Sequence, residues 1–532
     1  MRITNKIMNN YSVYNINTNK ALLDNLNTQM STRKKINDPT EDPVTAIQAL
    51  RYRGSLSEYT QYLGKNVTDA ASWTDTTQTA IDTAKDIIRS LKAEYTSASN
   101  GSNESTDRWT YYNNMRNIVN EYFSVGDTTN ENRYIFTGAR TGDSLTFSDK
   151  DFADRAKEHG GIFLDDHRDT FMYKAITEYF ELEDVESYSY TARTDNTGTS
   201  GFSGITDKEI NELSSVVDET TVQNVEVFRL RLSYEDLDTT QAGILGDENR
   251  KSLTLHVKNG STVTKYPVEM IRNDYEVNQD SFVGDRIYLN TTTGNLIFGS
   301  DMKAKVTEAL SGNGEVYYCY DKFHFETGDV KPEHLFDCVD VALKTSITYN
   351  DYSQDIYYNV GENQQIKVNS NAEDVFTLDA RRDLDELEDA LTAMDEAQAK
   401  VDRLKEMQED KLRYSTAEEQ QKITDLLRAA TKEAEYAKTK VDTMLSNGIT
   451  KAGDYFDMVN LAGTAMGTSV NRLNLIRNRL TEHQATTTAQ ASDNENIDIS
   501  TLAVEVNSAT LSYNAALQVT GKISQQSLVN FL

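Results

Sequence analysis

The sequence has few cysteines, no long apolar run and few basic residues, and each shortage excludes a class of protein. Two cysteines among 532 residues exclude a disulfide-stapled scaffold. No apolar run approaches the ~18–20 residues that a membrane-spanning helix needs. The opening residues MRITNKIMNNYSVYNIN lack the continuous apolar segment of a secretory signal peptide. On these grounds alone we expect a soluble chain with no cleaved signal peptide and no membrane partner.

Basic residues are outnumbered, 54 against 84 acidic residues, which gives a formal net charge of −30. A nucleic-acid-binding protein needs a basic surface to neutralise phosphates, so nucleic acid is not expected as a partner. The same charge disfavours an anionic membrane surface. Hydrophobic residues make up 38% of the chain, below the roughly 45–50% of typical soluble domains. Narrow helical seams suit this composition better than one large globular core.

The first sixty or so residues predict two helices joined by a turn. In the first helix, apolar residues repeat at intervals of seven, three and four, the spacing of a narrow stripe: Ile16, Leu23, Leu26 and Met30. The turn signal is the segment NDPTEDP, with its defining residues Asn37, Pro39, Asp42 and Pro43. Asp42 can cap the second helix, and Pro43 can take its first position, where a missing N–H costs nothing.

Helical patterns continue beyond the turn. The second helix is expected to make its apolar contacts through five residues: Val44, Ile47, Leu50, Leu56 and Leu63. Gly54 and Gly64 fall within it and weaken the expectation of an unbroken helix. Amphipathic spacing predicts further helices over residues 69–96 and around residues 115–123, separated by a polar loop at 97–107.

Residues 146–371 have a different, β-rich character. Phe228, Leu230 and Leu232 alternate with Arg229 and Arg231, the period-2 pattern of a half-buried strand. Leu255 and Val257 lead into Asn259-Gly260, a strong hairpin signal. Residues 286–290 and 296–298 flank a second expected hairpin turn.

Residues 372–446 predict a long, charged helical hairpin. Apolar residues in its second half alternate at intervals of four and three: Ile423, Leu427, Ala430, Ala434, Ala437, Val441 and Met444. Ser415 or Thr416 offers a fresh N-cap between the two helices. Such seams usually pack within the chain, and partner binding is the alternative.

The C-terminal segment has the most regular pattern of all. Its stripe alternates at intervals of three and four: Ile499, Leu502, Val506, Ala509, Tyr513, Ala516, Thr520 and Ile523. The flanking positions are mostly Asn, Ser, Thr and Gln, so little charge repulsion opposes close packing against identical helices. A solvated monomer surface would carry more Lys and Glu. This pattern favours polymer assembly.

Both ends of the chain resemble the flagellin family. The resemblance is carried by five segments: MRITNKIM, KKINDPTEDPVTAIQALRYR, NENRYIFTGARTGDSLTF, NRLNLIRNRL and KISQQSLVNFL. It covers roughly residues 1–147 and 450–532 and leaves the middle uncovered. The exit after the third helix and the last residues are similar to the hook-associated branch of the family, which stands where hook meets filament.

The resemblance implies an α+β fold class, in which paired N- and C-terminal segments form a long antiparallel helical bundle. An inserted β-rich domain and the charged helical hairpin complete it. The expected divisions are 1–60 paired with 495–532 as core helices, 61–145 paired with 447–494 as an outer bundle, 146–371 as the β-rich domain, and 372–446 as the hairpin. The two apolar stripes named above are the expected assembly interface.

The resemblance also implies a structural role in the bacterial flagellum, with export through the flagellar apparatus without a cleaved signal. The implied partners are copies of the chain, a neighbouring hook-associated protein, flagellin on the filament side, and an export chaperone at the C-terminus. For the turn at 37–43, a plain helix–helix connection and recognition by an export component both remain open. Two other functions remain open as well, a flagellin proper and a glycan-binding or adhesive module in the β-region.

One residue departs from the family pattern. Where the family has Ser-Gly-Lys before the basic turn, this chain has Ser31, Thr32 and Arg33. A threonine would be strained if the backbone there has a positive φ.

No catalytic motif is present in the sequence. Four metal-capable residues lie within twenty positions, Cys319, His324, His334 and Cys338, but their spacing matches no common zinc pattern. Ordinary side chains in a β-region are the favoured interpretation. The histidines form no H-E-x-x-H, and neither G-x-S-x-G nor a phosphate-binding loop occurs. We therefore expect neither enzyme activity, nor a metal, nor a cofactor.

Overall fold

A computed structural model describes residues 2–101, 103–152, 173–193, 219–237, 254–312, 314–322, 324–340, 345–347, 349 and 354–529. The chain divides into two compact units. Unit 1 consists of Met1–Ala71, Tyr357–Ile366 and Val470–Leu532, and unit 2 of Ser72–Ile356 and Lys367–Ser469. The α-helices are α1 (Arg2–Thr32), α2 (Pro43–Gln61), α3 (Val67–Ala98), α4 (Ser105–Val125), α7 (Ser300–Ser311), α8 (Ala372–Val375), α9 (Asp379–Glu409), α10 (Ala417–Glu495) and α11 (Ile499–Val529).

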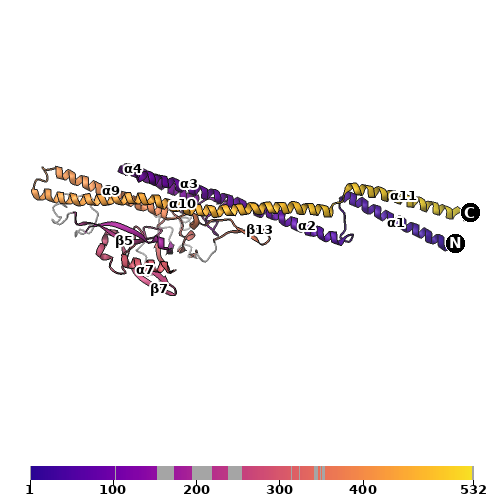
Figure 1. Ribbon diagram of the computed structural model, residues 1–532, viewed down its shortest axis with the longest axis horizontal. Coiled ribbons are helices and arrows are strands. Elements are labelled where there is room, and N and C mark those ends of the chain that lie inside the picture. Colours follow the sequence, from indigo (N-terminus) through magenta and orange to yellow (C-terminus); the bar gives the residue numbers. More distant parts are fainter. Residues whose placement is uncertain are drawn as a thin grey trace. The chain divides into compact units, whose positions relative to one another are not determined.

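In unit 1, α1 and α11 run side by side, and the two chain ends lie together at one end of the pair (Figure 1). Because the N-terminus of one helix meets the C-terminus of the other, the pair is antiparallel. Its seam contains Leu26, Leu502 and Ala509, with Leu23 and Val506 packed against them. The predicted pairing of the first and last helices is confirmed.

The second helix starts as the sequence predicts. Asp42 accepts hydrogen bonds from the backbone N–H groups of Val44 at 3.0 Å and Thr45 at 3.3 Å, and Pro43 occupies the first helical position. Gly54 lies inside α2 and does not break it. Gly64 lies in a single π-helical turn, Tyr62–Asn66, which connects α2 to α3 without a loop.

The last turns of α10 and a small hairpin complete unit 1. The ring of His483 in α10 stacks on Tyr59 of α2, with centroids 6.2 Å apart. The hairpin consists of β13 (Tyr357–Gly361) and β14 (Gln364–Lys367). Asn66 Nδ2 in the π-turn donates to the carbonyl oxygen of Asn359 in β13 at 2.7 Å.

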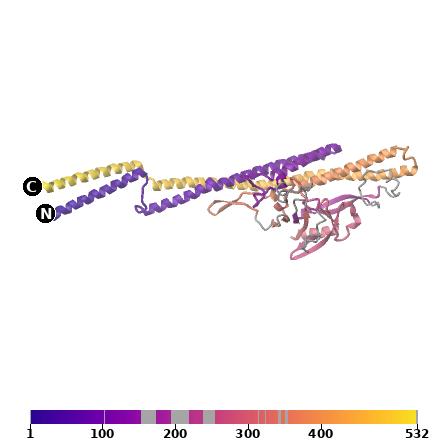
Figure 2. The ribbon, with the colours of Figure 1, turned by 180° about the vertical axis from the view of Figure 1, so that it is seen from behind.

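In unit 2, α9 and α10 form the predicted hairpin, and views from opposite sides show them running together (Figures 1 and 2). Thr416 caps α10, since its Oγ1 accepts from the Glu419 N–H at 3.2 Å and the Glu419 carboxylate accepts from the Thr416 N–H at 3.1 Å. The helix then continues without a break past residue 446 to Glu495, so one helix serves both the hairpin and the return segment. On α4, Arg116 pairs with Asp385 of α9 at 2.8 Å.

Glycine allows α3 and α10 to approach closely. A Cβ at Gly448 of α10 would overlap the ring of Tyr95 in α3, whereas a Cβ at Gly467 would meet only Gln78 Oε1 at an ordinary 3.7 Å. Both glycines are helical, where alanine is normally favoured by about 1 kcal/mol.

We expect Gly448→Ala to destabilise the chain by about 1–3 kcal/mol, because relieving the overlap shifts a buried tyrosine. Gly467→Ala is the matched control and is expected to stabilise by up to about 1 kcal/mol. Urea unfolding of both variants measures the difference. A gain in stability for Gly448→Ala would contradict the close helix approach.

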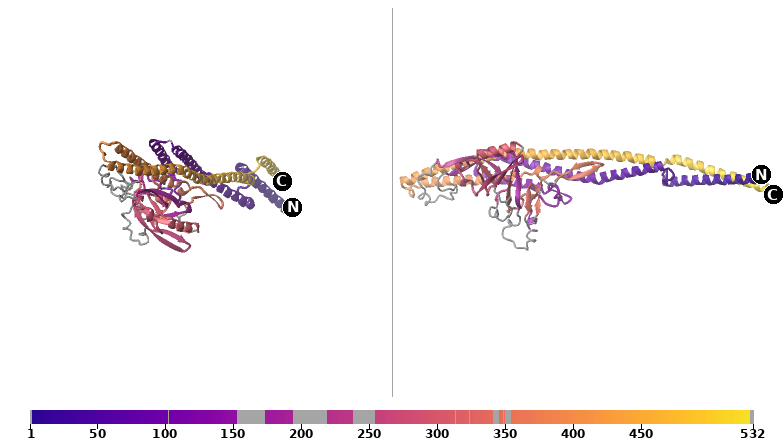
Figure 3. Two further views of the ribbon diagram at one scale, coloured as in Figure 1. Left: turned by 60° about the vertical axis from the view of Figure 1, so that its left-hand side comes forward. Right: turned by 90° about the horizontal axis from the view of Figure 1, so that it is seen from below.

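Ten of the strands that the structure describes in unit 2 form one sheet, in the order β12-β11-β3-β10-β6-β7-β8-β9-β5-β4. Every pairing is antiparallel except β7 with β8. The strands are β3 (Tyr173–Phe180), β4 (Glu186–Arg193), β5 (Val222–Arg231), β6 (Thr254–Asn259), β7 (Thr262–Ile271), β8 (Ile287–Asn290), β9 (Asn295–Phe298), β10 (Glu315–Lys322), β11 (Asp337–Asp340) and β12 (Thr345–Ile347). A separate pair, β1 (Thr129–Asn130) and β2 (Arg133–Tyr134), follows α4. Figure 3 shows the strands of this sheet gathered against the α9–α10 hairpin.

Both predicted hairpins are present, β6–β7 around Asn259-Gly260 and β8–β9 around residues 291–294. The strand predicted around residues 228–231 is present as part of β5, but its half-buried character is wrong at the two arginines. Its alternating arginines do not face solvent, since the side chains of Arg229 and Arg231 are 7% and 6% exposed. Acidic side chains of α9 cover them, and these come from a segment about 150 residues away in the sequence.

Candidate assembly surfaces

The structure brings together only some of the residues predicted for assembly. Leu23, Leu26, Leu502, Val506 and Ala509 meet in the seam between α1 and α11. Nearer the chain ends, three more of the predicted residues are half-buried along the same seam: Ile16, Tyr513 and Ala516. Met30 and Ile499 are instead exposed, and Ile523 lies beyond the side chains that the structure describes. Whether any of these residues contacts a neighbouring subunit remains a prediction.

The seam is thin for its length. Each of the two helices has 31 residues, yet the described part of the pair has only three fully buried apolar residues. Helices in proteins gain most of their stability by packing an apolar face against a partner. We therefore expect further burial to stabilise the pair along its whole length.

A second apolar stripe on α11 faces away from the seam, and sequence reasoning missed it. Val504, Leu511 and Val519 are 69%, 72% and 55% exposed. Val504 and Leu511 each follow a buried seam residue by two positions, which places them roughly 200° around the helix. Single exposed apolar residues are ordinary, but a repeated stripe marks an interaction surface. A search for two superimposed periodicities would have revealed this stripe in the sequence.

Helix α1 has an exposed apolar face as well. Four of its large apolar residues are exposed, and they follow one another at intervals of four, three and eight residues: Ile7, Tyr11, Tyr14 and Leu22. On α2, Val44, Ile47 and Leu50 are also exposed, so the single chain does not supply the apolar contacts expected of them. Only Ala49 of that helix is buried. Among the described side chains of these helices, large apolar residues are thus more often exposed than buried.

A compact connector joins the two helical pairs of unit 1. The Lys35 N–H donates to the Glu495 carbonyl oxygen at 2.8 Å, and the Ile497 N–H donates to the Arg33 carbonyl oxygen at 3.2 Å. Lys34 Nζ and an Arg53 nitrogen lie 2.8 Å and 2.7 Å from the Glu495 carboxylate. The hydrogen bonds from Arg53, followed by that from Lys34, lower the pKa of Glu495 to about 2.

The family turn motif lies in this connector. Asn37 Oδ1 accepts from Thr32 Oγ1 at 2.7 Å, and the Asn37 N–H donates to the Glu41 carboxylate at 3.0 Å. Pro39 lies in the turn between Asn37 and Glu41. The positive φ, 57°, falls on Arg33 and not on Thr32, which ends α1, so the threonine is not strained. The geometry accounts for the motif as a helix–helix connection.

We expect Glu495→Gln to lower the stability of unit 1 by about 1 kcal/mol, since both cationic partners are substantially exposed. The folded pKa of Glu495 is depressed, so its contribution is present above its unfolded pKa, near 4.3. It is lost as the pH falls from there toward about 2. Urea unfolding at pH 7 and pH 2.5 measures this, with Glu58→Gln on exposed α2 surface as control. The prediction is contradicted if the difference in unfolding free energy between Glu495→Gln and wild type is the same at pH 7 and pH 2.5.

In unit 2, the acidic side of α9 holds the arginines of β5 in an ion-pair network. Arg229 lies 2.7 Å from both Glu186 and Glu386, and Arg231 lies 2.6 Å from Asp383. Burial alone would raise the pKa of Glu386, but Arg229 and Arg231 outweigh it and hold the pKa well below its ordinary value. This network gives a structural role to three of the acidic residues of α9: Asp379, Asp383 and Glu386.

The four metal-capable residues are dispersed over several elements. Cys319 Sγ contacts Thr177 Oγ1 at 3.3 Å on the face of the sheet. His334 donates from Nε2 to the Ser144 carbonyl oxygen at 3.0 Å, and burial lowers its pKa to about 3. Burial raises the pKa of the Cys338 thiol. In the ranges that the structure describes, no three His, Cys, Asp or Glu side chains converge on a metal position.

None of the helices in the described ranges combines the length and apolar character needed to cross a bilayer.

The N-terminal part of the chain is similar to known proteins. Residues 3–141 match the family described as the bacterial flagellin N-terminal helical region. The chain is 28% identical over 144 residues to Flagellar hook-associated protein 3 of Salmonella typhimurium, covering 26% of this chain and 44% of that protein. It is 27% identical over 153 residues to the protein of the same name from Escherichia coli strain K12, covering 28% and 47%. The alignments thus span less than half of the length of either relative.

Proposed function

We propose that the chain is a structural subunit of the bacterial flagellum that joins hook to filament by helical self-assembly. The N-terminal match to flagellin and the two hook-associated relatives support a flagellar role. The observation that carries the proposal is the exposed apolar stripe on α11, opposite a seam with three buried residues among the side chains that the structure describes. Such a helix pair is incomplete alone and is suited to burial against neighbouring copies.

Assembly would bury both exposed apolar faces of the terminal pair. Each Val or Leu that is fully buried contributes roughly 1.5–3 kcal/mol. Val504, Leu511 and Val519 together would therefore contribute several kcal/mol per subunit. Since the stripe on α11 and the exposed face of α1 are different surfaces, the contact between copies is heterologous, the type that builds helical tubes.

This function implies several partners. On one side of a ring of subunits we expect a second hook-associated protein, and on the other side flagellin. An export chaperone would shield the apolar face of α11 before assembly, and the assembled protein would be extracellular. The role is structural, and no reaction is proposed for the chain.

The nearest alternative is a flagellin proper. The relatives found are hook-associated proteins, which favours the junction.

Gold labelling of an epitope-tagged chain in isolated flagella, together with quantitative mass spectrometry, tests the proposal. A junction subunit is expected at the hook–filament boundary alone. Its copy number should be small, because a ring needs only a few subunits. Label along the filament, or a copy number comparable to flagellin, would establish the alternative. Label absent from flagella would overturn both functions.

A further inference from the structure

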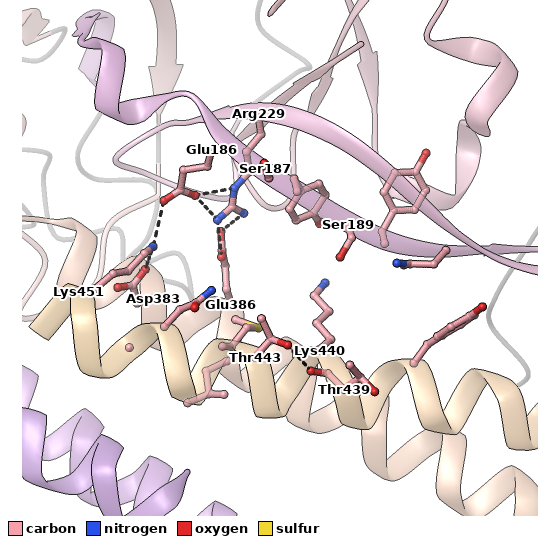
Figure 4. A pocket seen from close by; sticks show the side chains of 18 of the residues that line it. Glu186, Ser187, Ser189, Arg229, Asp383, Glu386, Thr439, Lys440, Thr443 and Lys451 are labelled. Atoms are coloured by element: carbon pink, nitrogen blue, oxygen red, sulfur yellow. Dashed lines mark hydrogen bonds and ion pairs between the residues drawn. The ribbon is translucent and has the colours of Figure 1, made fainter. Parts of the chain in front are cut away.

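A polar cavity opens in unit 2 between strand β4 and helices α9 and α10, with a volume of about 450 Å³. That volume lies in the range of small-molecule sites, ~300–1,000 Å³. Consecutive residues of β4, Glu186–Thr191, form one wall, and β4 is the end strand of the sheet. Figure 4 shows Ser189 of β4 and Lys440 of α10 pointing toward each other across the cavity.

The charged groups around the cavity neutralise one another. Arg229 pairs with Glu186 and Glu386, and Lys451 pairs with Asp383 at 2.8 Å and Glu186 at 3.2 Å (Figure 4). Lys440 is the further cation of the wall, and it lies over the ring of Tyr188, 5.3 Å from its centroid. Among the described lining residues, three acids face three bases. The formal charges of the lining residues therefore cancel, which disfavours a polyanion as the ligand.

Neutral hydrogen-bonding groups supply the remaining polarity. Among the described residues that line the cavity, five neutral polar side chains make no hydrogen bond to the protein: Ser187, Ser189, Thr191, Asn224 and Asn447. Hydroxyl and amide groups both donate and accept hydrogen bonds. Tyr436 of α10 places an aromatic ring beside the same space, whereas Tyr190 is only 3% exposed and Tyr188 lies under Arg229 and Lys440.

Together these features fit the chemistry of a sugar. A pyranose presents a ring of hydroxyls that can each donate and accept, and a face of C–H groups that packs on an aromatic ring. A nucleotide would carry phosphate groups, which a lining without net formal charge does not match. We propose that the cavity binds a neutral saccharide of one or two rings, a function separate from assembly.

Calorimetric titration of the full chain with a panel of neutral disaccharides tests the proposal. The panel consists of cellobiose, maltose, lactose and N,N′-diacetylchitobiose. Thr443→Trp places a bulky ring in the cavity from the exposed surface of α10. We expect it to weaken binding by at least about tenfold, because the ring occupies space needed by the ligand.

Thr431→Trp is the matched control. Thr431 and Thr443 are both exposed on α10, and each donates its Oγ1 to a carbonyl oxygen four residues earlier at 2.7 Å, but only Thr443 lines the cavity. Asn447→Ala, with the exposed Asn460→Ala as its own control, removes a neutral hydrogen-bonding group without adding bulk. We expect it to weaken binding about three- to tenfold.

Binding of at least one disaccharide that is lost in the cavity variants and kept in their controls is the expected result. Absence of binding to the whole panel at millimolar concentration overturns the proposal. So does an equal loss in a cavity variant and its control, or binding that the cavity variants leave unchanged. Incorporation of all four variants into flagella is expected to stay normal, so failure here is distinguishable from failure of the structural function.

Discussion

Replacing Val504 and Leu511 together by glutamate is expected to abolish incorporation into flagella while leaving the isolated chain folded. Both side chains are about 70% exposed, so neither contributes to the seam with α1. A carboxylate at either position is solvated in the free chain. In the assembled wall it would be buried without a partner, at a cost of several kcal/mol. A loss of about 4 kcal/mol per contact corresponds to on the order of a thousandfold weaker association.

The matched control adds the same two charges elsewhere on the same helix. Asn507 and Asn514 are exposed and also seven residues apart, and they border the outer stripe on one side, roughly 40–60° around the helix from Leu511. Asn507→Glu with Asn514→Glu should reduce incorporation far less. Immunoblots of isolated flagella measure incorporation, and far-UV circular dichroism of the purified chains checks the fold. Equal incorporation of the two double variants would refute the outer stripe as an assembly surface.

Substitution in the seam is expected to act differently. Ala509→Glu would place a charge at a position that is 6% exposed and packed between α1 and α11. It should separate the two helices in the free chain and thereby also prevent assembly. The two kinds of variant are distinguished by helix content before assembly, which falls only for the seam variant.

The terminal helices were predictable because their patterns are local. A stripe repeating at intervals of three and four identifies α11 and its buried face without knowledge of any other segment. The same is true of the N-cap at Asp42, which needs only the next three residues. The outer stripe is present in the sequence too, but polar residues separate Val504 from Leu511, so the two do not form an evident apolar pattern.

The burial of Arg229 and Arg231 could not be predicted from β5 alone. Alternation of apolar and charged residues normally places the charges in solvent. Whether the charged face is covered depends on α9, whose acidic residues lie far along the chain, and no local pattern links the two. The pocket beside β4 depends on the same long-range packing, because its walls come from β4, β5, α9 and α10.

Arg231→Met is expected to be the most destabilising single change in the ion-pair network, by about 3–5 kcal/mol. Methionine keeps most of the apolar stem of arginine, so the loss reports on the charge. Without Arg231, Asp383 and Glu386 lose a cation and remain covered by the sheet. Arg89→Met is the control, because the pair of Arg89 with Asp86 is exposed on both sides and contributes about 0.5 kcal/mol or less. Urea unfolding measures both, and hydrogen exchange of residues 222–231 reports on β5 directly.

The pH dependence distinguishes a charge effect from a packing defect. Burial alone would raise the pKa of Asp383, but Arg231 and Lys451 outweigh it, so the folded pKa is lower than the unfolded value. The stabilisation from this pair is therefore complete above pH ~4 and lost as the pH falls through the folded pKa. The gap in stability between wild type and Arg231→Met should accordingly narrow below pH 4, because the acids that Arg231 neutralises become protonated in both. A gap of constant size down to pH 2.5 would mean that Arg231 acts through packing alone, and that the acidic face of α9 does not hold the sheet electrostatically.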